Sequence, residues 1–160
     1  MAGNKKPKKK MKSVSELYRR ASNVKMRNML IEMKIICHPI DNFFKELRTS
    51  EEVLFINDMA IMKDEYFQRY LGIATAYVGF CDVMEILYKR KSLDASHIEP
   101  LRHIFQVVDT QESFTEKEVT DAENSWKEVR SVLANSTFGE VDALKREFEQ
   151  KERLANGIHQ

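Results

Sequence analysis

The feature that most constrains the fold of this chain is a long apolar stretch at residues 51–91. Its centre, residues 70–81 (YLGIATAYVGFC), contains no charged side chain. Apolar residues recur at helical spacing through the stretch, although they surround nearly the whole circumference of the expected helix. We therefore predict one long, central and largely buried helix here.

Three small residues, Gly72, Ala76 and Gly79, fall on one face of that expected helix. Small side chains along one stripe let a neighbouring helix approach closely. We predict that this face is a packing notch, so that Gly79→Leu would overpack it.

The rest of the chain also favours helices. Glycine and proline, which all-β folds use in turns, number only 5 and 3 in 160 residues. No stretch shows sustained alternation between apolar and polar residues. Capping pairs and apolar spacing predict helices at residues 13–36, 41–48 and 97–108, and in two segments that follow Thr115 and Thr137. The pair His38-Pro39 is expected to end the first of them.

These elements predict an all-α fold, a five- or six-helix bundle with a long central helix and essentially no β-sheet. The last two helices are joined by few residues, so we expect them to form an antiparallel C-terminal hairpin. Residues 13–160 are expected to be one helical domain. Residues 1–12 are expected to be a disordered basic tail, because their six lysines repel one another and nothing there can be buried.

The formal net charge of +1 conceals a strong asymmetry along the chain. Residues 1–36 contain 11 Lys and Arg but only two acids, whereas the remainder contains 15 Lys and Arg against 23 acids. A chain with a basic front and an acidic body often meets a polyanion with its front. The front also attracts the acidic body of the same chain or of another copy.

Basic residues in this front make up the candidate site. Lys12, Arg19, Arg27 and Lys34 recur at steps of seven or eight, so they form a stripe along one face of a helix. Oligo-lysine binds phosphates through charge and counterion release, without reading base sequence. The predicted nucleic-acid contacts are Lys5, Lys6, Lys8, Lys9, Lys10, Lys12, Arg19, Arg20 and Arg27.

The function predicted from these patterns is that of a non-enzymatic helical binding protein. Its lysine-rich arm would contact nucleic acid or a nucleoprotein assembly, and its acidic body would contact protein, copies of itself included. A short basic arm on a small helical body is typical of viral or phage accessory proteins. Two alternatives stay open: an adaptor or inhibitor without a nucleic-acid role, in which the tail only confers solubility, and a small helical enzyme.

The enzyme alternative has two sequence patterns behind it. Arg90 and His97 have a spacing similar to that of helical-bundle ribonucleases of the HEPN type, which would imply action on RNA phosphate; Lys91 stands where that pattern usually has a polar residue. The acid pairs Glu118-x-x-Asp121 and Glu149-x-x-Glu152 are similar to the Mg²⁺ ligands of all-α nucleotide pyrophosphohydrolases, in reversed order. Ordinary exposed helical surfaces explain these residues better.

No cofactor or metal site is predicted, because the chain has no Gly-rich phosphate loop and no HExxH or CxxC spacing. Cys37 and Cys81 lie in apolar surroundings and are expected to be free thiols in a reducing compartment, cytoplasmic or nuclear. We expect no signal peptide and no membrane contact, since the longest uncharged run of 12 residues is too short to span a bilayer.

Overall fold

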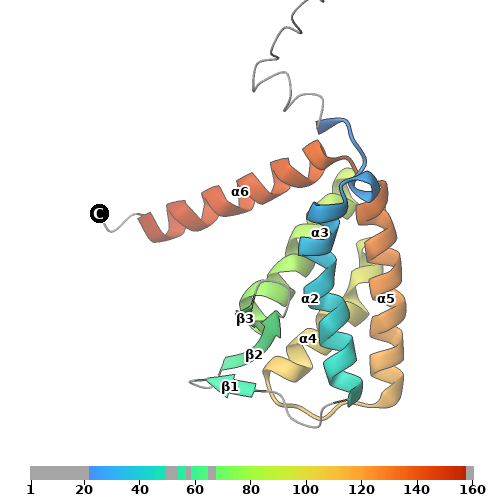
Figure 1. The fold of residues 1–160 in the computed structure, drawn as a ribbon, viewed down its shortest axis with the longest axis vertical. Coiled ribbons are helices and arrows are strands. Elements are labelled where there is room, and N and C mark those ends of the chain that lie inside the picture. Colours follow the sequence, from blue (N-terminus) through green and yellow to red (C-terminus); the bar gives the residue numbers. More distant parts are fainter. Residues whose placement is uncertain (1–21, 50–53, 57–58, 65–67, 158–160) are drawn as a thin grey trace, which may run out of the picture.

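The computed structural model describes residues 22–49, 54–56, 59–64 and 68–157, and these are mostly helical. The predicted start of a helix at residue 13 lies outside them. The elements, with the labels of Figure 1, are η1 (Met26–Asn28), α2 (Leu30–Thr49), β1 (Leu54–Ile56), β2 (Met59–Asp64), β3 (Arg69–Gly72), η2 (Ile73–Val78), α3 (Gly79–Arg90), η3 (Ala95–Ile98), α4 (Glu99–Asp109), α5 (Glu116–Asn135) and α6 (Phe138–Gly157).

The apolar stretch at residues 51–91 is not one helix, so that prediction is wrong. Its first half forms a three-stranded antiparallel sheet in the order β1-β2-β3, in which Ile61 pairs with both Leu54 and Gly72. The expectation of essentially no β-sheet is therefore wrong as well. The apolar residues all around the expected helix already argued against a simple amphipathic helix, because a short apolar run suits a strand as well as a helix. This run is also rich in β-branched and aromatic residues, which favour strands.

The second half of the stretch is helical, in two forms. η2 is a π-helix and runs directly into α3, where Cys81, Met84 and Leu87 are buried at helical spacing. The predicted packing notch is absent, because a Cβ added to Gly79 would meet no atom within 4 Å. Gly79 therefore borders open space, and the expectation that Gly79→Leu overpacks a contact is wrong.

Helix α2 differs from the prediction at both ends. Lys25 has an extended backbone and η1 follows it, so no continuous helix covers residues 13–36. At its other end α2 continues through Pro39 to Thr49, where two helices were expected. Proline removes one backbone hydrogen bond, at a cost of roughly 3 kcal/mol. The buried residues on both sides of it, Ile40 and Phe43 among them, offset that cost by packing in the core.

The core lies between α2, η2, α4 and α5, around an aromatic cluster. The Phe43 ring lies 4.9 Å from that of Phe105 and 5.7 Å from that of Tyr77, measured between centroids. The helix predicted at residues 97–108 corresponds to η3 and α4. The seam predicted for α5 is confirmed, because its members are all buried: Val119, Ala122, Trp126, Val129 and Leu133. The Thr115–Glu118 capping box that begins α5 is present too.

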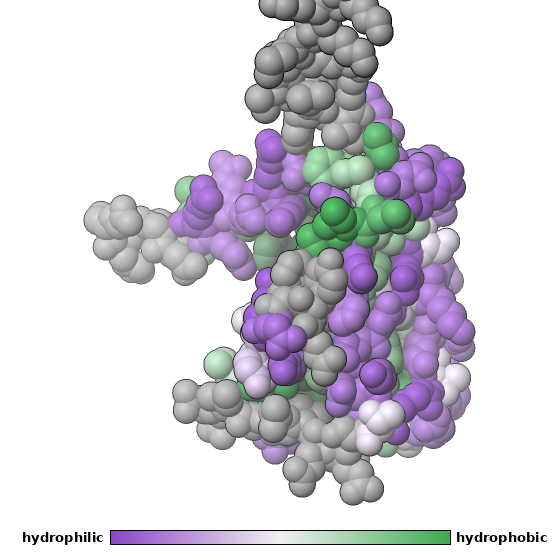
Figure 2. Space-filling model, in the orientation of Figure 1, coloured by the Kyte–Doolittle hydropathy of each residue, from purple (hydrophilic) through white to green (hydrophobic). Residues whose placement is uncertain are grey.

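The predicted C-terminal hairpin is wrong, because α6 turns away from α5 and projects from the bundle (Figure 1). The segment before η1 and the first residue of η1 occupy the junction: Phe138 N donates to Val24 O at 2.8 Å, and Met26 N donates to Ser136 O at 2.8 Å. With that segment between α5 and α6, α6 packs on α3, and Leu144 of α6 is buried. The distal part of α6 is exposed and hydrophilic (Figure 2).

Candidate nucleic-acid interface

Most of the predicted contact residues lie outside the described part of the chain: Lys5, Lys6, Lys8, Lys9, Lys10, Lys12, Arg19 and Arg20. Arg27 is described, in η1, and donates from Nη1 to Asn135 Oδ1 of α5 at 3.4 Å. Together with Lys34 it lines a hollow of about 420 Å³ between α2 and α5. The structure therefore brings these two members of the predicted stripe to one surface.

A second hollow, of about 350 Å³, continues the first between the same two helices, because Asp41 and Arg130 line both. We call the two together the α2–α5 groove. Its charged lining residues are the cations Arg27, Lys34, Lys45, Arg48, Lys127 and Arg130 and the carboxylates Asp41 and Glu123. Hydrophilic residues cover most of α2 and α5 on the face shown in Figure 2, apart from an apolar patch at the start of α2, where Leu30 and Ile31 are exposed. The groove is thus strongly basic on a chain whose body is acidic.

Two copies of one short motif build the second hollow. Residues 41–48 read DNFFKELR and residues 123–130 read ENSWKEVR, with four identical positions and conservative changes at three more. Each copy places an acid, an aromatic residue, a lysine and an arginine on one helix face. The hollow is lined by these four positions from both copies: Asp41, Phe44, Lys45, Arg48, Glu123, Trp126, Lys127 and Arg130.

The two copies contact each other reciprocally, because α2 and α5 run in opposite directions (Figure 1). Arg130 Nη1 of α5 donates to both carboxylate oxygens of Asp41 of α2, at 3.1 and 2.9 Å. Conversely, Arg48 Nε of α2 donates to Glu123 Oε1 of α5 at 2.8 Å. The acid of each motif therefore holds the arginine of the other, and a local pseudo-twofold axis relates the two helix faces.

Each arginine has a further contact that fixes its place. For Arg130 that contact is Trp126: the Arg130 guanidinium carbon lies 5.9 Å from the centroid of the Trp126 ring. The Trp126 ring is itself held by Asp41, because Trp126 Nε1 donates to Asp41 Oδ1 at 2.8 Å. Arg48 also pairs with Glu116 at 2.7 Å. Its hydrogen bonds to Glu123 and then to Glu116 raise its pKa above the ordinary value. Both arginines are thus charged and positioned before any ligand arrives.

The two lysines of the motifs differ from the arginines in their contacts. Lys45 and Lys127 are exposed, and the side chain of neither forms an ion pair or hydrogen bond with any described residue. By their places in the two motifs they lie between the reciprocal pairs, near the pseudo-twofold axis. An unpaired ammonium group that lines a hollow is available to an external anion. Sequence reasoning missed both lysines, although the eight-residue repeat would have pointed to them.

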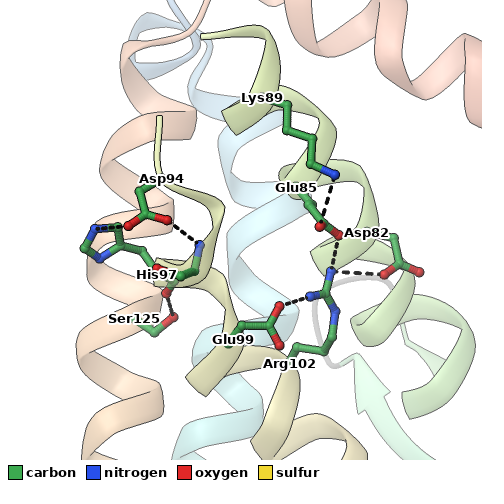
Figure 3. Close-up of polar contacts among 9 residues, drawn as sticks. Asp82, Glu85, Lys89, Asp94, His97, Glu99, Arg102 and Ser125 are labelled. Atoms are coloured by element: carbon green, nitrogen blue, oxygen red, sulfur yellow. Dashed lines mark hydrogen bonds and ion pairs between the residues drawn. The ribbon is translucent and has the colours of Figure 1, made fainter. Parts of the chain in front are cut away.

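The residues of the ribonuclease resemblance do not meet in one site. Arg90 Nη2 pairs with Glu147 of α6 at 2.6 Å. His97 lies in η3, and its Nδ1 is 3.3 Å from Glu128 of α5 (Figure 3 shows the neighbouring contacts of His97). Each side chain therefore has its own carboxylate partner on a different helix.

The two acid pairs are likewise apart. Glu118 accepts from the Thr115 backbone N–H in the capping box and lies 3.1 Å from His103, and these contacts, the first above all, lower its pKa. Glu149 and Glu152 lie on the distal part of α6, well separated from the start of α5 (Figure 1). Among the described residues, no group of three or more side chains is placed to hold a metal ion.

An acidic cluster lies on the α3–α4 side of the molecule. Arg102 pairs with Asp82 at 3.2 Å, with Glu85 at 2.9 Å and with Glu99 (Figure 3). Burial opposes the charge of Arg102, whose side chain is only 12% exposed, but Glu99 and Glu85 outweigh that effect and raise its pKa. Lys89 also pairs with Glu85, at 3.4 Å, so three carboxylates face two cations and the cluster keeps a net negative charge.

Positive and negative charge are therefore concentrated on different parts of the body, with the basic α2–α5 groove and the acidic cluster around Arg102 on different helix pairs.

None of the described helices combines the length and the apolar character needed to cross a membrane. In comparisons with known proteins, no protein-family model matches the chain, and no curated protein and no solved structure matches it either.

Proposed function

We propose that the protein binds nucleic acid through phosphate contacts, made by the lysine-rich arm at residues 1–12 and by the α2–α5 groove. The observation that carries the proposal concerns Lys45 and Lys127, whose side chains pair with no described residue and line a groove that also holds positioned arginines. Cations that replace condensed counterions on a phosphate backbone gain affinity without reading the bases. The protein acts here as a binding protein, not as an enzyme.

An extended anion suits this surface better than a small one. The groove cations run from Arg27, beside the start of α2, to Arg48 near its end. The 20 residues of α2 make a helix about 30 Å long. Several successive phosphates fit along such a length, and the predicted arm contacts precede the same end of α2 in the chain. A polymer with regular negative charge is the ligand that uses all of these cations together.

The acidic cluster supports the second half of the proposal, contacts with protein. Asp82, Glu85 and Glu99 converge on Arg102 and exceed its charge. Phosphates avoid such a surface, whereas a basic protein partner or the basic front of another copy complements it. We therefore assign protein contacts, self-association included, to the α3–α4 side of the body.

The proposal is tested by measuring the affinity of the full chain for a fluorescent nucleic-acid duplex of arbitrary sequence at several salt concentrations. We expect strong salt dependence, and a smaller slope of log K against log salt in two variants. One lacks residues 1–12. The other carries Lys45→Ala and Lys127→Ala, and its slope should fall by about 1 for each lysine removed.

The matched control is Lys151→Ala, an exposed lysine on the distal part of α6, away from the groove. It should leave affinity and slope unchanged. Absence of salt-dependent binding by the unaltered chain at low salt would refute the proposal. If a protein partner were nevertheless bound after deletion of residues 1–12, the adaptor alternative would take its place.

A further inference from the structure

The local symmetry of the second hollow of the α2–α5 groove carries information about its ligand. The motifs at residues 41–48 and 123–130 match position by position, lie on antiparallel helices and exchange their acid–arginine contacts. A rotation by half a turn would therefore exchange the motif positions of Lys45 and Lys127, and those of Arg48 and Arg130. The four motif cations therefore occupy matching places from either direction along this hollow, and Arg48 differs from Arg130 in its second carboxylate partner, Glu116.

An antiparallel nucleic-acid duplex has matching symmetry in its backbone. A twofold axis perpendicular to the helix axis relates its two strands, which is why twofold-symmetric proteins bind symmetric half-sites. Phosphates on opposite strands are exchanged by that rotation. A single strand has a direction and no such axis, so it would place two equivalent lysines against inequivalent positions.

The floor of the groove does not suit unpaired bases either. Its aromatic residues, Phe44 and Trp126, are only 6% and 5% exposed. The Trp126 ring is further occupied by its hydrogen bond to Asp41 and by the Arg130 guanidinium. Proteins that bind single strands combine a basic groove with aromatic faces on which bases stack. In a duplex the bases are already stacked on one another, so cations that contact the phosphates are sufficient for binding.

We infer that the ligand of the α2–α5 groove is double-stranded nucleic acid, and that Lys45 and Lys127 contact phosphates of opposite strands near a twofold axis of the duplex. The inference rests on the proposed function and narrows it to one class of nucleic acid. It also assigns equal roles to two lysines that are 82 positions apart in the chain.

The test compares the full chain with its variants on a short duplex of arbitrary sequence and on each of its separated strands, at one salt concentration and along a salt series. We expect the duplex to bind about tenfold or more tightly than either strand. Lys45→Ala and Lys127→Ala should each weaken duplex binding by the same factor and lower the duplex slope by about 0.9. The double variant should lose most of the preference for duplex, and Lys151→Ala should keep it. Thermal unfolding of each variant checks that the fold is unchanged.

The outcomes separate the two proposals. If strands bind as tightly as the duplex, the inference fails while the proposed function stands. If Lys45→Ala and Lys127→Ala differ more than about threefold in their effect on duplex affinity, the two lysines are not equivalent and the inference fails too. If neither duplex nor strand binds, the proposed function fails and the inference with it.

Discussion

Arg130 and Asp41 connect two helices that are far apart in the chain, through two hydrogen bonds from one guanidinium nitrogen at 3.1 and 2.9 Å. Their side chains are about half exposed, so the ion pair itself contributes little to stability. The same carboxylate also accepts from the buried Trp126 Nε1. Asp41 therefore has two separable roles: it satisfies a buried donor and it holds the groove arginine.

Substitutions at Asp41 should separate those roles. Asp41→Ala leaves Trp126 Nε1 without its acceptor, so we expect the free energy of unfolding to fall by about 1–2 kcal/mol. Asp41→Asn keeps an oxygen acceptor and removes the negative charge, so the loss should be smaller. Both variants release Arg130 for phosphates, and nucleic-acid affinity should rise. Urea denaturation and salt-dependent binding measure the two effects.

The control for this series is Asp121→Ala, an exposed acid of α5 that does not line the groove. Its stability should change by less than about 0.5 kcal/mol. If Asp41→Ala were as stable as the unaltered chain, the Trp126 hydrogen bond would not contribute as we argue.

The sequence predicted those elements whose ends carry local signals. Helices α5 and α6 begin at capping pairs whose two members lie within four residues of sequence: Thr115 with Glu118, and Thr137 with Glu140. Residues 54–72 were misassigned because their apolar run suits either structure and only pairing between strands decides it. The direction of α6 depends on backbone contacts of Val24 and Met26, more than 100 positions away, which no local pattern encodes.

The site could be predicted only in part, for a similar reason. Arg27 and Lys34 were identified from helical spacing, and they do line one hollow. Lys45 and Lys127 were not identified, because each is an ordinary surface lysine until α2 and α5 lie side by side. A comparison of the chain with itself over eight residues, shorter than the repeats usually sought, reveals the motif pair. It would not have revealed that the two copies face each other.

Gly79 offers a prediction that reverses the one drawn from sequence. It has right-handed helical backbone angles, φ −58° and ψ −39°, and an added Cβ would meet no atom within 4 Å. Alanine is more favourable than glycine in a helix by roughly 1 kcal/mol. We therefore expect Gly79→Ala to raise the free energy of unfolding by up to about 1 kcal/mol, measured by thermal or urea denaturation.

Gly139 is the matched contrast, since it too is a helical glycine. An added Cβ there would lie 2.9 Å from both the Cβ and the carbonyl oxygen of Ser22. Gly139→Ala should therefore push apart the junction between α6 and the segment before η1, and destabilise the protein by about 1–3 kcal/mol. Equal effects of the two substitutions would contradict this account of the junction.

The two thiols predict how stability responds to alkaline pH. Burial raises the pKa of Cys37 from 9.0 to about 11 and that of Cys81 from 9.0 to about 12. A group whose pKa is raised by folding stabilises the fold fully below its unfolded pKa, and that contribution is lost as pH rises towards the folded value. We expect the free energy of unfolding to fall between about pH 9 and pH 12. Cys81→Ala should make that decline shallower in urea denaturation at stepped pH, and an unchanged slope would contradict the assignment.

Arg102 leads to the last prediction, because it pairs with three carboxylates at once. Arg102→Met keeps the apolar stem and removes the charge, so Asp82, Glu85 and Glu99 then repel one another. These carboxylates are partly hydrated, with side chains 34–60% exposed, so we expect a moderate loss of about 1–2 kcal/mol at neutral pH. Arg153→Met on the exposed part of α6 is the control and should cost less than about 0.5 kcal/mol.

The loss at Arg102 should also depend on pH with a defined sign. Lys89 and then Arg102 hold the pKa of Glu85 below its ordinary value of 4.5. A carboxylate with a lowered pKa stabilises the fold above its unfolded pKa, and that contribution disappears as pH falls below it. The difference between Arg102→Met and the unaltered chain should therefore shrink in acid, as Glu85 becomes neutral below its ordinary pKa of 4.5 and its ion pair with Arg102 no longer contributes. Urea denaturation at neutral and acidic pH measures this, and a difference that stayed constant in acid would show that Arg102 contributes through packing and not through its charge.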